Sequence, residues 1–174
     1  KAMYMVILPE LVLVTGALAF FLLSLGKTPS EQTTKSLAIV VGLVTFAATL
    51  LSFQSQVTLF YGAYAVDQYS QLFKVMIGFA LAVLMIFGQN LKGISISVRP
   101  EYYLFLLLSV LGLMMLVSSV ELIAIFISLE LSSFALYLLV PMRDDRTGIR
   151  VQMEAGMKYI LFGVMATGFM LYGM

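Results

Sequence analysis

Long apolar runs separated by short polar segments dominate the pattern of this chain. A helix that spans a membrane needs about 20 mainly apolar residues, and six runs reach or approach that length. The predicted spans are Met3–Leu25, Ser36–Phe53, Ser70–Gly88, Tyr102–Val120, Glu121–Val140 and Val151–Met174. Because these runs leave only short connections, the pattern predicts an all-α, polytopic transmembrane helix bundle with six spans and no large soluble domain.

The fourth and fifth runs are nearly continuous and are separated only by the small polar cluster Val117-Ser118-Ser119-Val120-Glu121. One helix over both runs, about 38 residues, would be about 57 Å long, nearly twice the hydrocarbon thickness of a bilayer. We therefore expect a tight turn at this cluster. Asp67, just before the third run, is predicted to cap the N-terminus of that helix.

Composition supports a membrane protein and excludes several kinds of site. Of the 174 residues, 61% are hydrophobic and 11% are charged, whereas soluble domains carry about 25% charged residues. The sequence has no His and no Cys, which excludes His or Cys metal sites, a haem-ligating His, iron–sulfur clusters and disulfides. A net charge of +1 leaves no basic surface for nucleic acid. We expect no cofactor in this chain, so any redox centre would lie in another subunit.

The distribution of Lys and Arg predicts the orientation. The segments after the first, third and fifth spans contain Lys27, Lys35, Lys92, Arg99, Arg143, Arg146 and Arg150, whereas the opposite side contains only Lys1. The positive-inside rule therefore places these segments in the cytoplasm and the N-terminus outside. Since the chain begins with Lys1 and its last apolar run is unbroken at Met174, we expect both ends to continue in a longer protein.

Glu130 is the leading candidate for a functional residue. It lies in the middle of the fifth run, where an ionised side chain costs about 2.5–3.5 kcal/mol on insertion scales and needs a partner, a hydrated cavity or a function. Helical spacing places Ser133 and Tyr137 on the same face, so hydroxyl groups accompany the carboxylate. That face is predicted to point into protein, and the alternative role of Glu130 is a structural tie between helices.

Glu154 and Lys158 form an i,i+4 pair in the favourable order on the sixth run. Counted from the short connection before this run, Lys158 lies within about three residues, or 4–5 Å, of the depth of Glu130. A Glu and a Lys that meet in a low dielectric shift each other's pKa, which is the physical basis of a proton relay. The simpler alternatives are a solvated interfacial Glu154 and a Lys158 that snorkels to the surface.

Lys74 and Glu121 are secondary candidates, and Glu10 is a third charged residue at a span end. Lys74 lies a few residues inside the third span from the outer side and is more typical of a snorkelling or structural residue. Glu121 lies at the turn between the fourth and fifth runs, and Glu10 lies beside Pro9 near the outer end of the first. Glu121 and Glu10 are both predicted to be interfacial, and of these two Glu121 is the candidate for a role in function.

A family resemblance rests on the stretch around Glu130. The pattern Leu129-Glu130-Leu131-x-Ser133-x-x-Leu136-Tyr137, together with Met153-Glu154-Ala155-Gly156-Met157-Lys158-Tyr159, resembles the antiporter-like membrane subunits of respiratory complex I, in particular the subunit N type of bacterial NADH-quinone oxidoreductase. The resemblance is good over residues 101–174. Over the first three spans it rests on hydropathy and on Val66-Asp67-x-Tyr69-Ser70-x-Leu72-Phe73.

The resemblance implies a larger subunit of about fourteen helices in two inverted repeats, of which residues 1–100 would be an N-terminal three-helix segment and residues 101–174 the start of the first proton-translocation unit. In the family, the Glu that matches Glu130 pairs with a Lys on a later helix and takes part in proton translocation driven by quinone reduction elsewhere. Glu154 and Lys158 match polar positions close to the cytoplasmic side of that path. NADH, FMN, iron–sulfur clusters and quinone are then implied in partner subunits, and a bacterial inner membrane is the implied location, ahead of a plastid or mitochondrial one.

Two alternatives stay open on the sequence alone. Multisubunit sodium/proton antiporters and membrane-bound hydrogenases contain subunits with the same Glu and Lys pattern. The chain could also be a structural spacer in which Glu130 only holds helices together.

Overall fold

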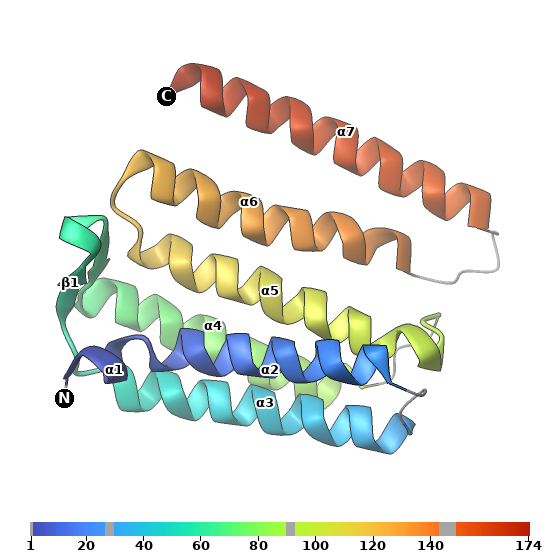
Figure 1. Cartoon of the computed structure of the whole chain (residues 1–174), viewed down its shortest axis with the longest axis horizontal. Coiled ribbons are helices and arrows are strands. Elements are labelled where there is room, and N and C mark those ends of the chain that lie inside the picture. The colour runs from blue at the N-terminus through green and yellow to red at the C-terminus, as the bar shows by residue number, and fades with distance from the viewer. Residues whose placement is uncertain (1, 27–29, 90–92, 143–148) are drawn as a thin grey trace.

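The computed structural model describes residues 2–26, 30–89, 93–142 and 149–174. In these ranges the structure has six long helices, and each runs antiparallel to the one before it (Figure 1): α2 (Leu8–Leu25), α3 (Glu31–Ser52), α4 (Gln68–Phe87), α5 (Arg99–Ser118), α6 (Leu122–Leu139) and α7 (Ile149–Gly173). All six are long and apolar enough to cross a membrane. The predicted all-α, polytopic bundle is therefore confirmed.

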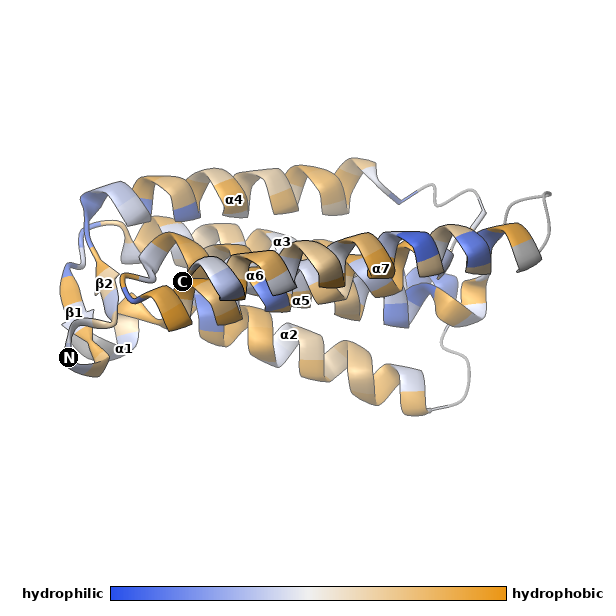
Figure 2. Cartoon of the chain, turned by 90° about the horizontal axis from the view of Figure 1, so that it is seen from above, coloured by the Kyte–Doolittle hydropathy of each residue, from blue (hydrophilic) through white to orange (hydrophobic). Residues whose placement is uncertain are grey.

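The core lies between α2, α3, α4 and α5. Leu13, Phe20 and Leu107 are fully buried there, and the rings of Phe20 and Tyr103 stack with their centroids 5.4 Å apart. Hydrophobic residues cover most of the length of these helices (Figure 2), and large apolar side chains such as Leu18, Val44 and Phe79 are exposed, as expected for helices surrounded by lipid rather than water. α6 packs against α5, and α7 packs against α6 and the short 3-10 helix η3 (Val140–Met142).

The backbones of α5 and α6 approach closely at Gly112. A Cβ atom at this position would lie 2.6 Å from the backbone nitrogen of Ser132 and 2.9 Å from the carbonyl oxygen of Ser128. Beside this contact, the hydroxyl oxygens of Ser109 and Ser132 are 3.2 Å apart in the buried interface. Small residues thus let the two helices pack backbone to backbone, as helices in membranes commonly do.

The first predicted span is interrupted in the structure. A short helix α1 (Ala2–Val6) ends before Ile7, and α2 starts at Leu8 instead of continuing from Met3. The cause is Pro9, which lacks a backbone N–H and clashes with the preceding turn, so it is accommodated only in the first turn of a new helix.

The second span starts five residues earlier than hydropathy predicts, at Glu31. Ser30 caps this helix by accepting a hydrogen bond from the backbone N–H of Thr33, and Lys35 pairs with Glu31 at 2.8 Å within the first turns. These polar turns are helical but carry no hydropathy signal. The third to sixth spans differ from prediction by three residues or fewer at each end. The predicted Asp67 cap is confirmed, with Ser70 completing a capping box.

A small β-hairpin that the sequence did not indicate connects α3 to α4. Its strands are β1 (Val57–Leu59) and β2 (Tyr64–Val66), joined by the 3-10 turn η1 (Phe60–Gly62). Phe60, Tyr61 and Gly62 all have positive φ angles, of 52°, 56° and 98°. The hairpin lies at the same end of the bundle as α1 and the turn between α5 and α6 (Figure 1).

The described basic residues agree with the predicted sidedness of the loops. Lys35 and Arg99 lie near the starts of α3 and α5, at the end opposite the hairpin, and both pair with Glu31. Lys1, Lys27, Lys92, Arg143 and Arg146 lie outside the described residues. The orientation of the bundle in a membrane stays a prediction.

Candidate functional site

Glu130 lies in the middle of α6 and is half-buried against α7. Its Oε1 atom accepts a hydrogen bond of 2.6 Å from the hydroxyl of Thr167 on α7. The same hydroxyl lies 3.0 Å from the carbonyl oxygen of Gly163, one turn earlier on its own helix. The carboxylate therefore points into protein, between two helices, and has a partner that can both donate and accept a hydrogen bond.

Tyr137 fixes the spacing of α6 and α7 two turns from Glu130. Its side chain is 8% exposed, and its ring meets that of Tyr159 edge to face with centroids 4.9 Å apart. A Cβ atom on Gly163 would lie only 2.0 Å from the Tyr137 hydroxyl oxygen, so the glycine provides the space that the ring fills. Ser133, the other hydroxyl residue predicted on this face, is half-buried.

Glu154 and Lys158 form the predicted ion pair on α7, with Lys158 Nζ 2.6 Å from Glu154 Oε1. The pair is largely exposed, with 66% of the lysine and 60% of the glutamate side chain accessible. Lys158 precedes Thr167, the partner of Glu130, by nine residues, which corresponds to about 13 Å along a helix.

The structure therefore does not bring Lys158 to the level of Glu130, and the predicted offset of 4–5 Å is too small. The reason is that α7 begins farther out along the bundle than the point where α6 ends (Figure 1). Residues of α6 and α7 that are equally many positions away from the connection between these helices therefore do not lie at the same depth in the bundle. Glu121, the residue before α6, is exposed, as predicted for an interfacial position.

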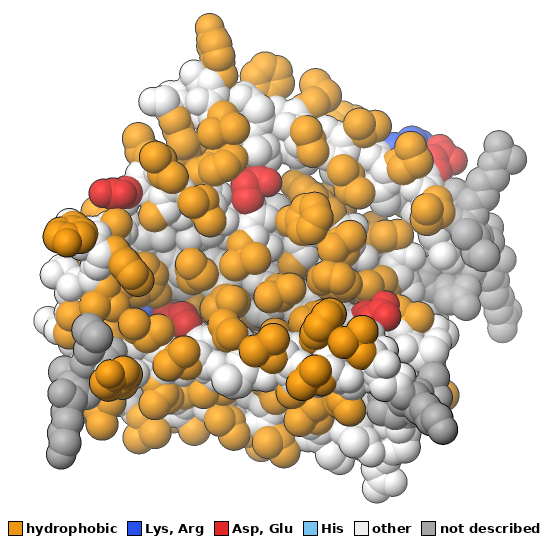
Figure 3. Space-filling model, in the orientation of Figure 1, with side chains coloured by type: hydrophobic (Ala, Val, Ile, Leu, Met, Phe, Trp, Pro, Cys, Tyr) orange, Lys and Arg blue, Asp and Glu red, His pale blue; other side chains and the backbone are white. Residues whose placement is uncertain are grey.

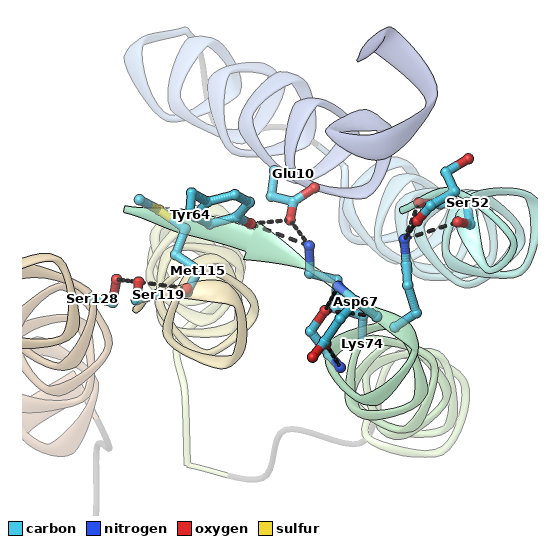
Figure 4. Close-up of polar contacts among 11 residues, drawn as sticks. Glu10, Ser52, Tyr64, Asp67, Lys74, Met115, Ser119 and Ser128 are labelled. Atoms are coloured by element: carbon cyan, nitrogen blue, oxygen red, sulfur yellow. Dashed lines mark hydrogen bonds and ion pairs between the residues drawn. The ribbon is translucent and has the colours of Figure 1, made fainter. Parts of the chain in front are cut away.

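Two roles were predicted for Lys74, snorkelling or structural, and its surroundings distinguish them. Its side chain is fully buried, and its Nζ atom lies 2.6 Å from Oε1 of Glu10, which is itself only 6% exposed. The hydroxyl of Tyr64 donates to the same Glu10 oxygen at 2.6 Å, and Lys74 Nζ lies 3.2 Å from that hydroxyl (Figure 4). A snorkelling lysine would keep its ammonium in water, so the snorkelling interpretation of Lys74 is wrong. Glu10 is likewise buried and not interfacial.

We name Glu10, Tyr64 and Lys74 the outer triad, because they join α2, β2 and α4 at the hairpin end of the bundle. Burial, and then the nearby Glu10 carboxylate, raise the pKa of Tyr64 far above its ordinary value, so its hydroxyl keeps its proton. A signal for the burial of Lys74 was present in the sequence. Gln71, Lys74 and Gly78 recur at helical spacing on one face of α4, and all are buried.

The remaining acidic residues are dispersed. In the ranges that the structure describes, no group of three or more Asp or Glu residues could hold a metal ion. On the face shown in Figure 3, isolated acidic side chains interrupt an otherwise apolar surface. The arrangement offers separate carboxylates, of which Glu10 is buried and Glu130 half-buried, and such groups can individually gain and lose a proton.

Comparison with known proteins adds to this geometry. A family model described as NADH:quinone oxidoreductase/Mrp antiporter, TM, matches residues 119–174, which contain Glu130, Glu154 and Lys158. A protein of Opitutus terrae named NADH-quinone oxidoreductase subunit N 2 is 46% identical over 166 residues, covering 95% of this chain and 34% of the relative. The protein of the same name from Syntrophobacter fumaroxidans is 39% identical, with the same coverage.

A solved structure is similar as well. A chain of respiratory complex I from Thermus thermophilus with bound aureothin superposes with a TM-score of 0.73 at 28% identity, covering 95% of this chain and 35% of that one. The chain thus spans about a third of the length of the relatives it matches. The predicted resemblance is confirmed by sequence and by fold.

Proposed function

Because this chain is homologous along 95% of its length to the antiporter-like subunit N of NADH-quinone oxidoreductases, we propose that it forms part of a proton-translocating membrane subunit of a complex I type enzyme. In this proposal residues 101–174 begin the antiporter-like unit, and residues 1–100 precede it. The chain itself performs no redox chemistry. NADH, FMN, iron–sulfur clusters and quinone belong to partner subunits, and neighbouring membrane subunits drive the proton cycle.

The observation that carries the proposal is the half-buried Glu130 carboxylate held by Thr167 between two helices. When Glu130 is ionised, the Thr167 hydroxyl donates to it. When Glu130 is protonated, it donates to Thr167 Oγ1, and the threonine proton turns to the carbonyl oxygen of Gly163, 3.0 Å away. Both protonation states are thus hydrogen-bonded without a shift of heavy atoms, as a group that repeatedly gains and loses a proton requires.

Glu154 and Lys158 have a separate role in this proposal. Their exposed ion pair lies toward the start of α7, at the end of the bundle where Lys35 and Arg99 also lie. We assign them to the cytoplasmic entry, where they attract and exchange protons, and not to a direct pair with Glu130. With this orientation the N-terminus lies on the periplasmic side of a bacterial inner membrane.

The decisive variant is Glu130→Gln in the complete enzyme, measured in membrane vesicles. We expect the number of protons translocated per NADH oxidised to fall at least about twofold, because the amide retains the shape but cannot carry the proton. Thr167→Val should produce a smaller decrease, since it removes the partner and leaves the carboxylate. Glu101→Gln, on the neighbouring α5, is the matched control and should leave pumping unchanged, because an amide can still accept the hydrogen bond from Ser24.

Two other results would lead to different conclusions. If Glu130→Gln left quinone reduction and pumping at parental levels, the proposed role of Glu130 would be wrong. If it lowered the amount of assembled complex but not pumping per complex, Glu130 would be a structural tie.

A second candidate function is a subunit of a sodium/proton antiporter, because the matching family model describes Mrp antiporters together with the oxidoreductases. Proton movement that depends on sodium and proceeds without any electron donor would favour this candidate. The two relatives described above are both named NADH-quinone oxidoreductase subunit N 2, which favours the first.

A further inference from the structure

The outer triad is connected to α6 through the β-hairpin. Tyr64 contributes its hydroxyl to the triad, while its backbone forms an antiparallel bridge with Ser119, in the turn between α5 and α6. Next to it, the backbone N–H of Val120 donates to the carbonyl oxygen of Ala63 at 2.9 Å. The hairpin therefore contacts the ion pair through the Tyr64 side chain (Figure 4) and contacts the α5–α6 turn through its backbone.

The turn is in contact with the helix that carries the candidate proton site. The hydroxyl oxygens of Ser119 and Ser128 are 3.1 Å apart, and Ser119 is also bonded to the carbonyl oxygen of Met115 on α5. Ser128 lies two residues before Glu130 on α6. The described contacts thus lead without interruption from α2 and α4, through the hairpin and the turn, to the segment of α6 that contains Glu130.

The triad depends on one oxygen atom. Glu10 Oε1 receives both the ammonium of Lys74 and the hydroxyl of Tyr64, whereas the buried Oε2 atom has no hydrogen-bond partner in the part of the chain that the structure describes. Removing Lys74 would leave a buried carboxylate with a single neutral donor. A buried charge without a partner costs far more free energy than a paired one. The hairpin and α2 would therefore have to move so that water can reach the Glu10 carboxylate.

We propose that the outer triad is a positioning device for the Glu130 site: the Glu10–Lys74 pair holds Tyr64, Tyr64 holds the hairpin on the α5–α6 turn, and the turn sets the position of α6 relative to α7. The inference rests on the proposed function of Glu130. It adds that residues of α2, the hairpin and α4, far from Glu130 in the sequence, influence proton translocation without exchanging the proton themselves.

The experiment uses the complete complex with Lys74→Met, Tyr64→Phe and the double variant Glu10→Gln/Lys74→Met. The first unpairs the carboxylate, the second removes only the hydroxyl, and the third removes both charges at nearly constant volume. Lys35→Met, which breaks a partly exposed ion pair on α3, is the control. Amide hydrogen exchange over residues 57–66 and 118–122 and the pH profile of proton pumping per assembled complex are measured for each.

We expect Lys74→Met to accelerate exchange in both segments about tenfold, because local opening no longer has to break the ion pair, and to shift the pH profile of pumping. The double variant should recover most of both effects, and Tyr64→Phe should show a smaller change in the same direction. Lys35→Met should behave like the parent. Tyr64→Phe and the double variant keep the test available if Lys74→Met does not assemble.

Two results would overturn the inference. Parental exchange rates at 118–122 in both Lys74→Met and Tyr64→Phe would mean that the triad does not hold the turn. Faster exchange with an unchanged pH profile would mean that the turn does not position Glu130. The exchange measurement does not depend on pumping, and Glu130→Gln tests the proposed function separately, so failure of either proposal can be recognised.

Discussion

Replacing Gly112 with valine is expected to prevent the complex from assembling. The new side chain would start from a Cβ atom 2.6 Å from the backbone nitrogen of Ser132, and a backbone atom cannot turn aside as a side chain can. α5 and α6 would have to separate along their contact, which would also break the buried approach of Ser109 to Ser132. Overpacking of this kind costs about 1–3 kcal/mol or more, so we expect the amount of assembled complex to fall at least about tenfold.

The measurement is the quantity of intact complex on native gels, compared across Gly112→Ala, Gly112→Val and the control Gly26→Ala. Gly26 has an extended backbone, and a Cβ atom there would have no neighbour closer than 3.6 Å. The loss should increase from alanine to valine at position 112 and be absent at position 26. Normal assembly of Gly112→Val would show that α5 and α6 do not pack backbone to backbone.

The second large effect is expected at Gly163. A methyl group at this position would overlap the hydroxyl end of Tyr137, with 2.0 Å between the Cβ and the phenolic oxygen. Either the ring leaves its site or α7 moves away from α6, and the second response separates Thr167 from Glu130. We expect Gly163→Val to lower the amount of assembled complex about fivefold, and the complex that does form to pump poorly, because interhelical contacts in membranes depend on close packing at small residues.

A compensating variant distinguishes two causes of the lost assembly: the steric clash with Tyr137 and the change in helix propensity when glycine is replaced. Shortening the obstructing side chain in Gly163→Ala/Tyr137→Leu should restore more assembled complex than Gly163→Ala alone. Gly168→Val, on the same helix but with no atom within 4 Å of the new Cβ, is the control for the loss of a glycine. If the double variant assembled no better than Gly163→Ala, the contact between Tyr137 and Gly163 would not be the cause.

The spans could be predicted from the sequence because the solvent imposes their length. Any helix that crosses a bilayer needs a continuous apolar segment, so α4, α5 and α6 were located to within three residues. The polar start of α3 was missed because a capped helix can extend into the headgroup region without apolar side chains. The break before α2 was missed because the local effect of Pro9 was hidden within an otherwise apolar run.

The candidate site was predictable only in part. The hydroxyl residues on the face of Glu130 predicted a protein-facing carboxylate, and in the structure Glu130 is half-buried and accepts a hydrogen bond from Thr167. The relative depth of Lys158 could not be obtained by counting residues, because it depends on where α7 begins along the bundle. Nor did the sequence indicate the outer triad, since Glu10, Tyr64 and Lys74 come from segments separated by up to 64 residues and no local pattern records that they meet.

The outer triad helps to maintain a strained backbone conformation at the tip of the hairpin. Phe60 and Tyr61 adopt left-handed backbone conformations that side chains disfavour, at about 1–3 kcal/mol each, and such conformations persist only where the surroundings enforce them. The ring of Tyr61 is fully exposed and contributes no packing at the tip. The strained conformation of this turn is therefore held by contacts at the base of the hairpin, which are those of Tyr64 and of the α5–α6 turn. If these contacts are weakened, we expect the backbone at Phe60 and Tyr61 to adopt a less strained conformation. The hairpin tip should therefore be the first part of the bundle to change conformation when the ion pair is lost.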